Sequence, residues 1–217
     1  MKRLILTTGL AVAFFVLSSF SGSGYEKKMQ ETIAKMYSNY TVESYMQVAN
    51  QFAVIGKAEP EEWLPWYYHA NANIMLVFLD AEADFETKQQ YLKKADQALT
   101  MILQKFPEES EIQVMNAFYA VSNMAIDQAN AGQFIPRYSA AVAKAIELEP
   151  ENPRARFFQI SSKIGEAQFF GKPTDIFCNH LTQLHEEWDA YQAKSVLHPQ
   201  WGKEEVRKKS VEIGCAN

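Results

Sequence analysis

Apolar residues recur at intervals of three and four along nearly the whole chain from Tyr25 onward, and this periodicity is the strongest constraint on the fold. Runs such as Val48, Phe52 and Ile55 place their side chains on one face of a helix. Alternation with a period of two, which is typical of half-buried strands, is nearly absent, and Val, Ile and Thr are not grouped between hairpin turns. The sequence therefore predicts an all-α protein.

Three prolines, Pro60, Pro107 and Pro150, each end one apolar stripe and precede another within a few residues. A proline cannot continue a helix, so each one marks a junction between two helices. When the chain is aligned on these prolines, three positions before each and three after it are apolar or aromatic in every copy. We interpret the pattern as three related helical hairpins. The aligned positions are Val48, Phe52, Ile55, Tyr67, Tyr68 and Ala70, then Ala95, Leu99, Ile102, Val114, Met115 and Ala117, then Tyr138, Val142, Ala145, Phe157, Phe158 and Ile160.

The third junction resembles the end of one tetratricopeptide repeat and the start of the next, and it reads AVAKAIELEPENPRARFF. Over most of residues 40 to 213 the chain is similar to a secreted, uncharacterised tetratricopeptide-like family of Gram-negative bacteria, in the segments EPEEWLPWYYHANANI, LEPENPRARFF and LHPQWGKEEV. The resemblance implies a right-handed α-solenoid of extended, degenerate repeats, because the prolines are 47 and 43 residues apart and the usual period is about 34. It implies no activity, since such families carry no catalytic motif.

We expect nine helices, of which the last is a C-terminal cap. Thr41 and Ser110 are predicted to cap helix N-termini. The irregular segment 193–202, AKSVLHPQWG, is expected to fold back and to cover the apolar edge of the last repeat with Val196, Leu197 and Trp201. The expected helices are residues 25–37, 41–57, 61–81, 85–105, 109–131, 135–148, 153–167, 173–192 and 203–213.

Residues 1–23 follow the plan of a secretory signal peptide, because Lys2 and Arg3 precede an apolar stretch and small residues follow it. An uncleaved N-terminal anchor is the alternative, since the apolar stretch is slightly long for a signal peptide. Cleavage leaves residues 24–217 as one helical repeat domain, periplasmic or secreted. This domain has 19 basic and 26 acidic residues, and no later stretch approaches membrane-spanning length. The lack of a long basic run argues against nucleic acid as the main partner.

Motifs for catalysis or metal binding are missing from the sequence. His180 and His185 are five residues apart, whereas two ligands on one helix face require a spacing of four. The chain has no Gly-rich phosphate loop, nucleophile elbow or Cys-x-x-Cys pair. We therefore expect a protein that is not an enzyme and has no metal and no cofactor.

Both cysteines, Cys178 and Cys215, lie in the exported part of the chain, where an oxidising compartment permits a disulfide bond. Such a bond would pin the last helix onto the final hairpin and contribute on the order of 3 to 4 kcal/mol in the chain-entropy model. Two free, unrelated thiols are the alternative. The sequence does not decide between them.

In the tetratricopeptide family, the first helix of each pair lines a concave groove, and its second, fifth, ninth and twelfth positions contact the ligand. The resemblance therefore implies a non-enzymatic scaffold that binds a protein or peptide in this groove. The groove lacks the lysine and arginine clamp that holds the terminal carboxylate of a peptide. The candidate binding residues are Tyr67, Asn71, Glu111, Phe118, Arg154 and Phe157.

The densest aromatic group of the chain comprises Trp63, Trp66, Tyr67 and Tyr68. Spacings of three and four place Trp63, Trp66 and Tyr67 on one helix face, which is typical of a packed contact between repeats. Exposed rings of this kind also stack on sugar faces. A carbohydrate-binding accessory protein that uses these four aromatics is therefore the alternative function.

Overall fold

The computed structural model describes residues 22–215, and helices are the only regular elements in this range, which confirms the all-α prediction. The predicted signal peptide lies outside the described residues except for its last two positions. The three short 3-10 helices are η1 (Gln128–Gln133), η2 (Asp175–Phe177) and η3 (Trp188–Ala190). The α-helices are α1 (Gly22–Ser38), α2 (Val42–Ala58), α3 (Leu64–Leu79), α4 (Phe85–Lys105), α5 (Ser110–Ile126), α6 (Ile135–Leu148), α7 (Pro153–Phe169), α8 (Cys178–Glu187) and α9 (Lys203–Glu212).

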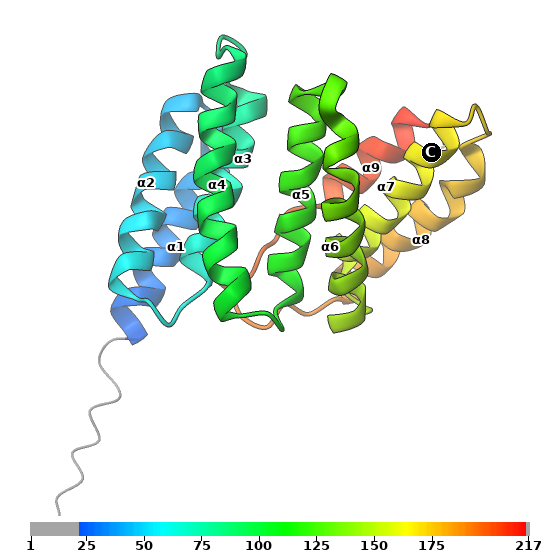
Figure 1. Ribbon diagram of the computed structural model, residues 1–217. Coiled ribbons are helices and arrows are strands. Elements are labelled where there is room, and N and C mark those ends of the chain that lie inside the picture. The colour runs from blue at the N-terminus through cyan, green and yellow to red at the C-terminus, as the bar shows by residue number, and fades with distance from the viewer. Residues whose placement is uncertain (1–21, 216–217) are drawn as a thin grey trace, which may run out of the picture.

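Consecutive helices form antiparallel hairpins that lie side by side in chain order, from α1 and α2 at one end to α7 and α8 at the other (Figure 1). The odd-numbered helices also contact one another along this row, α1 with α3, α3 with α5 and α5 with α7. We call the surface that these four helices form the inner face.

The proline alignment identified the core correctly. All nine aligned positions before the three prolines are buried, and so are eight of the nine positions after them. The exception is Phe157, which is half-buried. Apolar periodicity therefore specified which face of each helix is turned inward.

Helix boundaries follow local chemistry. The hydroxyl of Thr41 accepts a hydrogen bond from the backbone N–H of Ser44 at 3.2 Å, which confirms the predicted N-cap of α2. The prediction for Ser110 is wrong, because Glu109 occupies the N-cap position of α5 and the Ser110 hydroxyl donates to the carbonyl of Ala145.

Two expected helices are interrupted. The helix expected over 109–131 ends at Ile126, and the Asp127 carboxylate then accepts from the backbone N–H of Asn130 and starts η1. The segment expected to be one helix over 173–192 consists of η2, α8 and η3. Only α8 in this segment is a regular α-helix.

The core decreases in size toward the C-terminus. The largest buried cluster contains residues of α1, α2, α3, α4 and α5, and a second cluster contains residues of α5, α6 and α7. The third cluster joins α7, η3 and the two last α-helices. Its buried members are Ile160, Ile164, Leu181, Leu184, Trp188 and Val206.

Candidate functional site

A non-helical segment of the chain lies across the inner face. We call residues 191–202, which connect η3 to α9, the strap; it is drawn in orange in Figure 1, where it passes behind the gap between α4 and α5 on its way to α9. Leu197 is 6% exposed and belongs to the largest core cluster, whereas Val196 is 61% exposed. The prediction that this segment covers the edge of the last repeat is therefore correct only for Trp201, which packs against Phe158 of α7. Leu197 instead belongs to the cluster of the first two hairpins, and Val196 is exposed.

Hydrogen bonds fix the strap to the inner face. The hydroxyl of Tyr68 donates to the carbonyl of Leu197 at 2.8 Å, and the indole N–H of Trp201 donates to the hydroxyl of Tyr67 at 2.9 Å. The guanidinium of Arg154 donates to the carbonyl of Trp201 at 3.2 Å. The strap thus contacts α3 and α7 with both its backbone and its side chains.

Beneath the strap lies a buried ion pair between Arg154 of α7 and Glu111 of α5. Their side chains are 2% and 3% exposed, and three N–H···O contacts of 2.7 to 2.9 Å join them. Asn152 donates to the same carboxylate at 2.8 Å. Burial acts to lower the pKa of Arg154, but the charge and hydrogen bonds of Glu111 outweigh it and raise this pKa. The two side chains are therefore paired in the interior.

Four of the six candidate groove residues lie in this interior. Tyr67, Glu111 and Arg154 form one network, and Asn71 is 4% exposed with its amide directed at the sulfur of Met115. Burial, followed by the charge of Glu111, raises the pKa of Tyr67. These four side chains are therefore covered, and Trp201 of the strap contacts both Tyr67 and Arg154.

The repeat analogy did not indicate that the chain occupies its own inner face. One sequence feature is consistent with this placement of the strap. In AKSVLHPQWG, the apolar residues Leu197 and Trp201 lie in a segment without helical periodicity. Only their partners, Tyr68 and Tyr67, reveal where these side chains bind.

The aromatic group at the start of α3 is part of the core. Tyr67 and Tyr68 are fully buried, and Trp63 is 8% exposed. Trp66 lies against α2, where a Cβ added to Gly56 would come within 2.6 Å of the indole. The structure thus contradicts the expectation of an exposed carbohydrate platform, because these rings pack between hairpins.

The other two groove candidates, Phe118 and Phe157, belong to an aromatic cluster that reaches the surface. We call Phe78, Phe118, Phe157, Phe158 and Trp201 the aromatic row. The rings of Phe78 and Phe118 are nearly parallel, at 3° and 6.2 Å between centroids, and Trp201 lies 5.7 Å from Phe118. Phe158 connects Phe118 to Phe157 at 6.2 and 6.0 Å. The row thus joins α3, α5, α7 and the strap.

Part of the aromatic row is accessible to a ligand. Phe78 is 48% exposed, and Phe118, Phe157 and Trp201 are half-buried. One turn after Phe157, the hydroxyl of Ser161 is buried without a hydrogen-bond partner among the described residues. Parallel and edge-on rings of this kind can stack on a flat apolar molecule.

A second concave region lies between α1 and α2. It has a volume of about 810 Å³, and its lining includes Tyr25 and Val54 together with Lys28 and Glu31. Val54 is 67% exposed. The two helices that line it, α1 and α2, are at the opposite end of the helical row from α8 (Figure 1).

In residues 22–215 no group of three or more His, Cys, Asp and Glu side chains is arranged to hold a metal ion. Burial lowers the pKa of His69, whose ring nitrogen lies 2.8 Å from the carbonyl of Ala49. His198 of the strap lies edge-on to Trp63. Within the same residues, no helix has the length and apolar character needed to cross a membrane.

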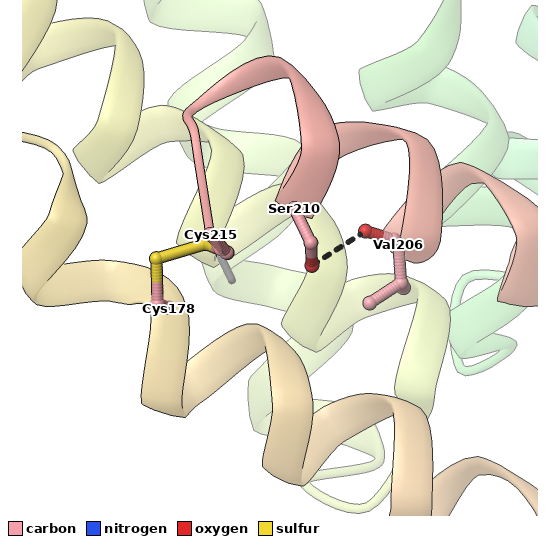
Figure 2. The surroundings of a disulfide bond; sticks show 4 residues. All are labelled: Cys178, Val206, Ser210 and Cys215. Atoms are coloured by element: carbon pink, nitrogen blue, oxygen red, sulfur yellow. Dashed lines mark hydrogen bonds between the residues drawn. A yellow bond between two sulfur atoms is a disulfide. The ribbon is translucent and has the colours of Figure 1, made fainter. Parts of the chain in front are cut away.

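The cysteines form a disulfide bond between Cys178, at the start of α8, and Cys215, just after α9 (Figure 2). Their Cα atoms are 5.5 Å apart. Of the two alternatives that the sequence left open, the structure thus contains the bonded one, and the bond ties α9 to the last hairpin.

Comparison with known proteins gives one informative likeness. No family model matches the chain, and no curated protein matches it. Among solved structures, the chain is similar to the HusA haemophore from Porphyromonas gingivalis, with a TM-score of 0.72 over 90% of this chain and 96% of the haemophore chain. Sequence identity is 22%, so the likeness concerns the fold alone. The chain therefore shares its all-helical fold with this haemophore.

Proposed function

We propose that this protein is a non-enzymatic binding protein of the extracytoplasmic space that takes a flat, apolar ligand of the porphyrin class on its aromatic row. The observation that carries the proposal is the parallel pair Phe78 and Phe118, of which Phe78 is 48% exposed. The structural likeness to a haemophore, a carrier of haem, supports the choice of ligand class.

The row has the chemistry that such a ligand needs. A porphyrin is a rigid aromatic plane, and its burial against stacked rings combines apolar burial with favourable ring geometry. The row draws its rings from three helices and the strap, so the helical scaffold holds them in place. We interpret this scaffold as an α-solenoid of tetratricopeptide-like hairpins with α9 as its cap.

The ligand is tested by absorbance titration of the mature protein with haemin and with iron-free protoporphyrin. We expect both to bind, because ring stacking does not require iron. Phe78→Ala should weaken binding about tenfold or more, since it removes the exposed ring. Phe85→Ala is the matched control, because Phe85 is 52% exposed on α4 and lies outside the row. The proposal is wrong if neither porphyrin binds, or if the two variants behave alike.

Peptide binding on the inner face is a second candidate, and one observation favours it. The inner face already holds a non-helical peptide segment of this chain, with Leu197 buried and its carbonyl bonded to Tyr68. Another peptide would have to displace the strap. We expect a labelled peptide of sequence SVLHPQW to bind a Leu197→Ala/Trp201→Ala variant more tightly than the wild-type protein in fluorescence anisotropy. Equal weak binding to both proteins would remove this candidate.

A further inference from the structure

The last helix has little packing of its own. Val206 is the buried residue of α9, and this helix contacts α8. A ten-residue helix with one buried side chain gains little from apolar burial, and helices of this length are marginal on their own. The position of α9 therefore depends on what holds its two ends.

The C-terminal end of α9 is held by the disulfide bond. Cys215 follows the last turn of the helix, within which the Ser210 hydroxyl donates to the carbonyl of Val206 (Figure 2). The backbone N–H of Cys215 donates to the carbonyl of Ser210. At the other end, Gly202 has a φ of +118°, and a Cβ added there would lie 2.6 Å from the indole of Trp188. The N-terminal end of α9 thus packs closely against Trp188 of η3 through the last residue of the strap.

The strap has few backbone hydrogen bonds of its own. Among the described contacts, the bond within it is the turn from the N–H of His198 to the carbonyl of Ser195. The strap is held by the burial of Leu197 and by the bonds of Leu197 and Trp201 to the inner face. Tyr191 also donates to Glu149, and Lys194 pairs with Glu109, each at 3.0 Å. The strap lies entirely within the covalent ring that the disulfide closes, because Cys178 precedes it and Cys215 follows it.

From these contacts we propose that the Cys178–Cys215 pair is a redox switch for the strap. With the bond formed, α9 is fixed and the strap is seated, so that Trp201 completes the aromatic row. With the bond reduced, α9 detaches from α8 and the strap leaves the inner face. This opens the surface around Tyr67 and Arg154 and removes Trp201 from the row.

The redox step is an ordinary thiol–disulfide exchange. One thiolate of the pair attacks a disulfide of an oxidant in the exported compartment, and the second thiolate displaces that oxidant from the mixed disulfide. The two cysteines lose two electrons and two protons, and the oxidant leaves as a dithiol. A chain that has just been exported with reduced cysteines is therefore in the open state.

Limited chymotrypsin digestion tests whether the strap is released. Cleavage after Leu197 or Trp201 requires the strap to leave the inner face, whereas Tyr40, which is 59% exposed between α1 and α2, serves as an internal reference. We expect the Cys178→Ser/Cys215→Ser variant and the reduced wild-type protein to be cut in the strap about tenfold faster or more than the oxidised protein. Fragments are analysed after reduction, because the disulfide would otherwise keep them joined.

Two controls separate strap release from global unfolding. Tyr68 lies buried in α3, so cleavage there should stay slow in every sample. Val196→Ala changes an exposed strap residue and should leave the resistance of the oxidised protein unchanged. Equal strap cleavage in oxidised and reduced protein overturns the inference, and so does cleavage that accelerates at Tyr68 and in the strap alike.

The consequence for ligand binding rests on the proposed function, and it is measured separately. We expect the Cys178→Ser/Cys215→Ser variant to bind protoporphyrin several-fold more weakly than the oxidised wild-type protein, because Trp201 leaves the row. If the wild-type protein binds no porphyrin, the proposed function fails and the digestion still tests the strap. If porphyrin binds and the strap is cut equally in both redox states, the switch alone fails.

Discussion

The two ends of the molecule use the same helical hairpins but stabilise them differently. In α1 to α4 large side chains such as Met29, Met36 and Phe52 are 0 to 1% exposed, and they belong to the largest core cluster. The cluster around α7, α8 and α9 has six buried members, and a disulfide bond supplements it. The long hairpins thus bury a large apolar core, whereas the short last hairpin combines a smaller core with a covalent bond, as small cores often do.

Between these ends, buried polar contacts supplement the apolar cluster of α5, α6 and α7. The pair Arg154 and Glu111 joins α7 to α5, and the strap connects both to α3 through Trp201 and Tyr67. The centre of the molecule thus combines apolar burial with directed polar interactions, and the predictions below test this difference.

The largest effect is expected from Glu111→Ala. This change leaves the buried guanidinium of Arg154 without its counter-ion, and it should lower the free energy of unfolding by about 3 to 5 kcal/mol. Urea denaturation followed by circular dichroism measures it. The double variant Glu111→Leu/Arg154→Met should recover much of the loss, because it removes both charges. A single variant as stable as the wild-type protein would mean that the pair does not hold the centre together.

Removal of the disulfide bond should cause the second largest loss in the free energy of unfolding. Replacing Cys178 and Cys215 by serine removes the restraint on a 37-residue separation, and we expect a loss on the order of 3 to 4 kcal/mol in the chain-entropy model. Thermal unfolding of the variant and of the oxidised wild type measures this loss. Mass spectrometry of the intact wild-type protein should show two alkylated thiols only after reduction. Two alkylated thiols without reduction would show that the last hairpin is held by packing alone.

A pair of glycine substitutions sharpens the comparison within the C-terminal end. Gly202→Ala should cost about 1 to 3 kcal/mol, because it strains a left-handed residue and brings a methyl group against Trp188. Gly165→Ala is the matched control, since nothing lies near its added Cβ in α7 and alanine favours a helix, so it should stabilise by up to about 1 kcal/mol. Thermal unfolding of the two variants gives the contrast. Equal shifts would indicate that the contact with Trp188 is loose.

The smallest expected effect is on how the free energy of unfolding depends on pH. Burial lowers the pKa of His69 from its ordinary value of 6.5, so the unfolded chain binds a proton more readily than the folded one. The stability that the neutral ring contributes is present above pH 6.5 and is lost as the pH falls through the lowered pKa. His69→Asn should therefore make the free energy of unfolding less dependent on pH between about 7 and 5. An unchanged slope in urea denaturation at several pH values would contradict this explanation.

Local sequence signals predicted most of the helices and their core faces. The proline-aligned positions proved buried because helical periodicity and proline geometry act over a few residues, as at Val48 and Leu99. The interrupted segment over 173–192 was missed, since its 3-10 turns depend on small differences in backbone geometry. Of the candidate site, Phe118 and Phe157 reach the surface, whereas Tyr67, Asn71, Glu111 and Arg154 lie in the interior.

The sequence by itself determined the helical class, the hairpin junctions and the inward faces, because these depend on short-range periodicity. Tertiary structure alone decided that the strap fills the inner face, that Glu111 and Arg154 pair there, and that Cys178 meets Cys215. The bond from Tyr68 to Leu197 joins residues 129 positions apart, and no local pattern encodes a partner at that distance. Such contacts form only when the stacked hairpins have created the surface on which the strap lies.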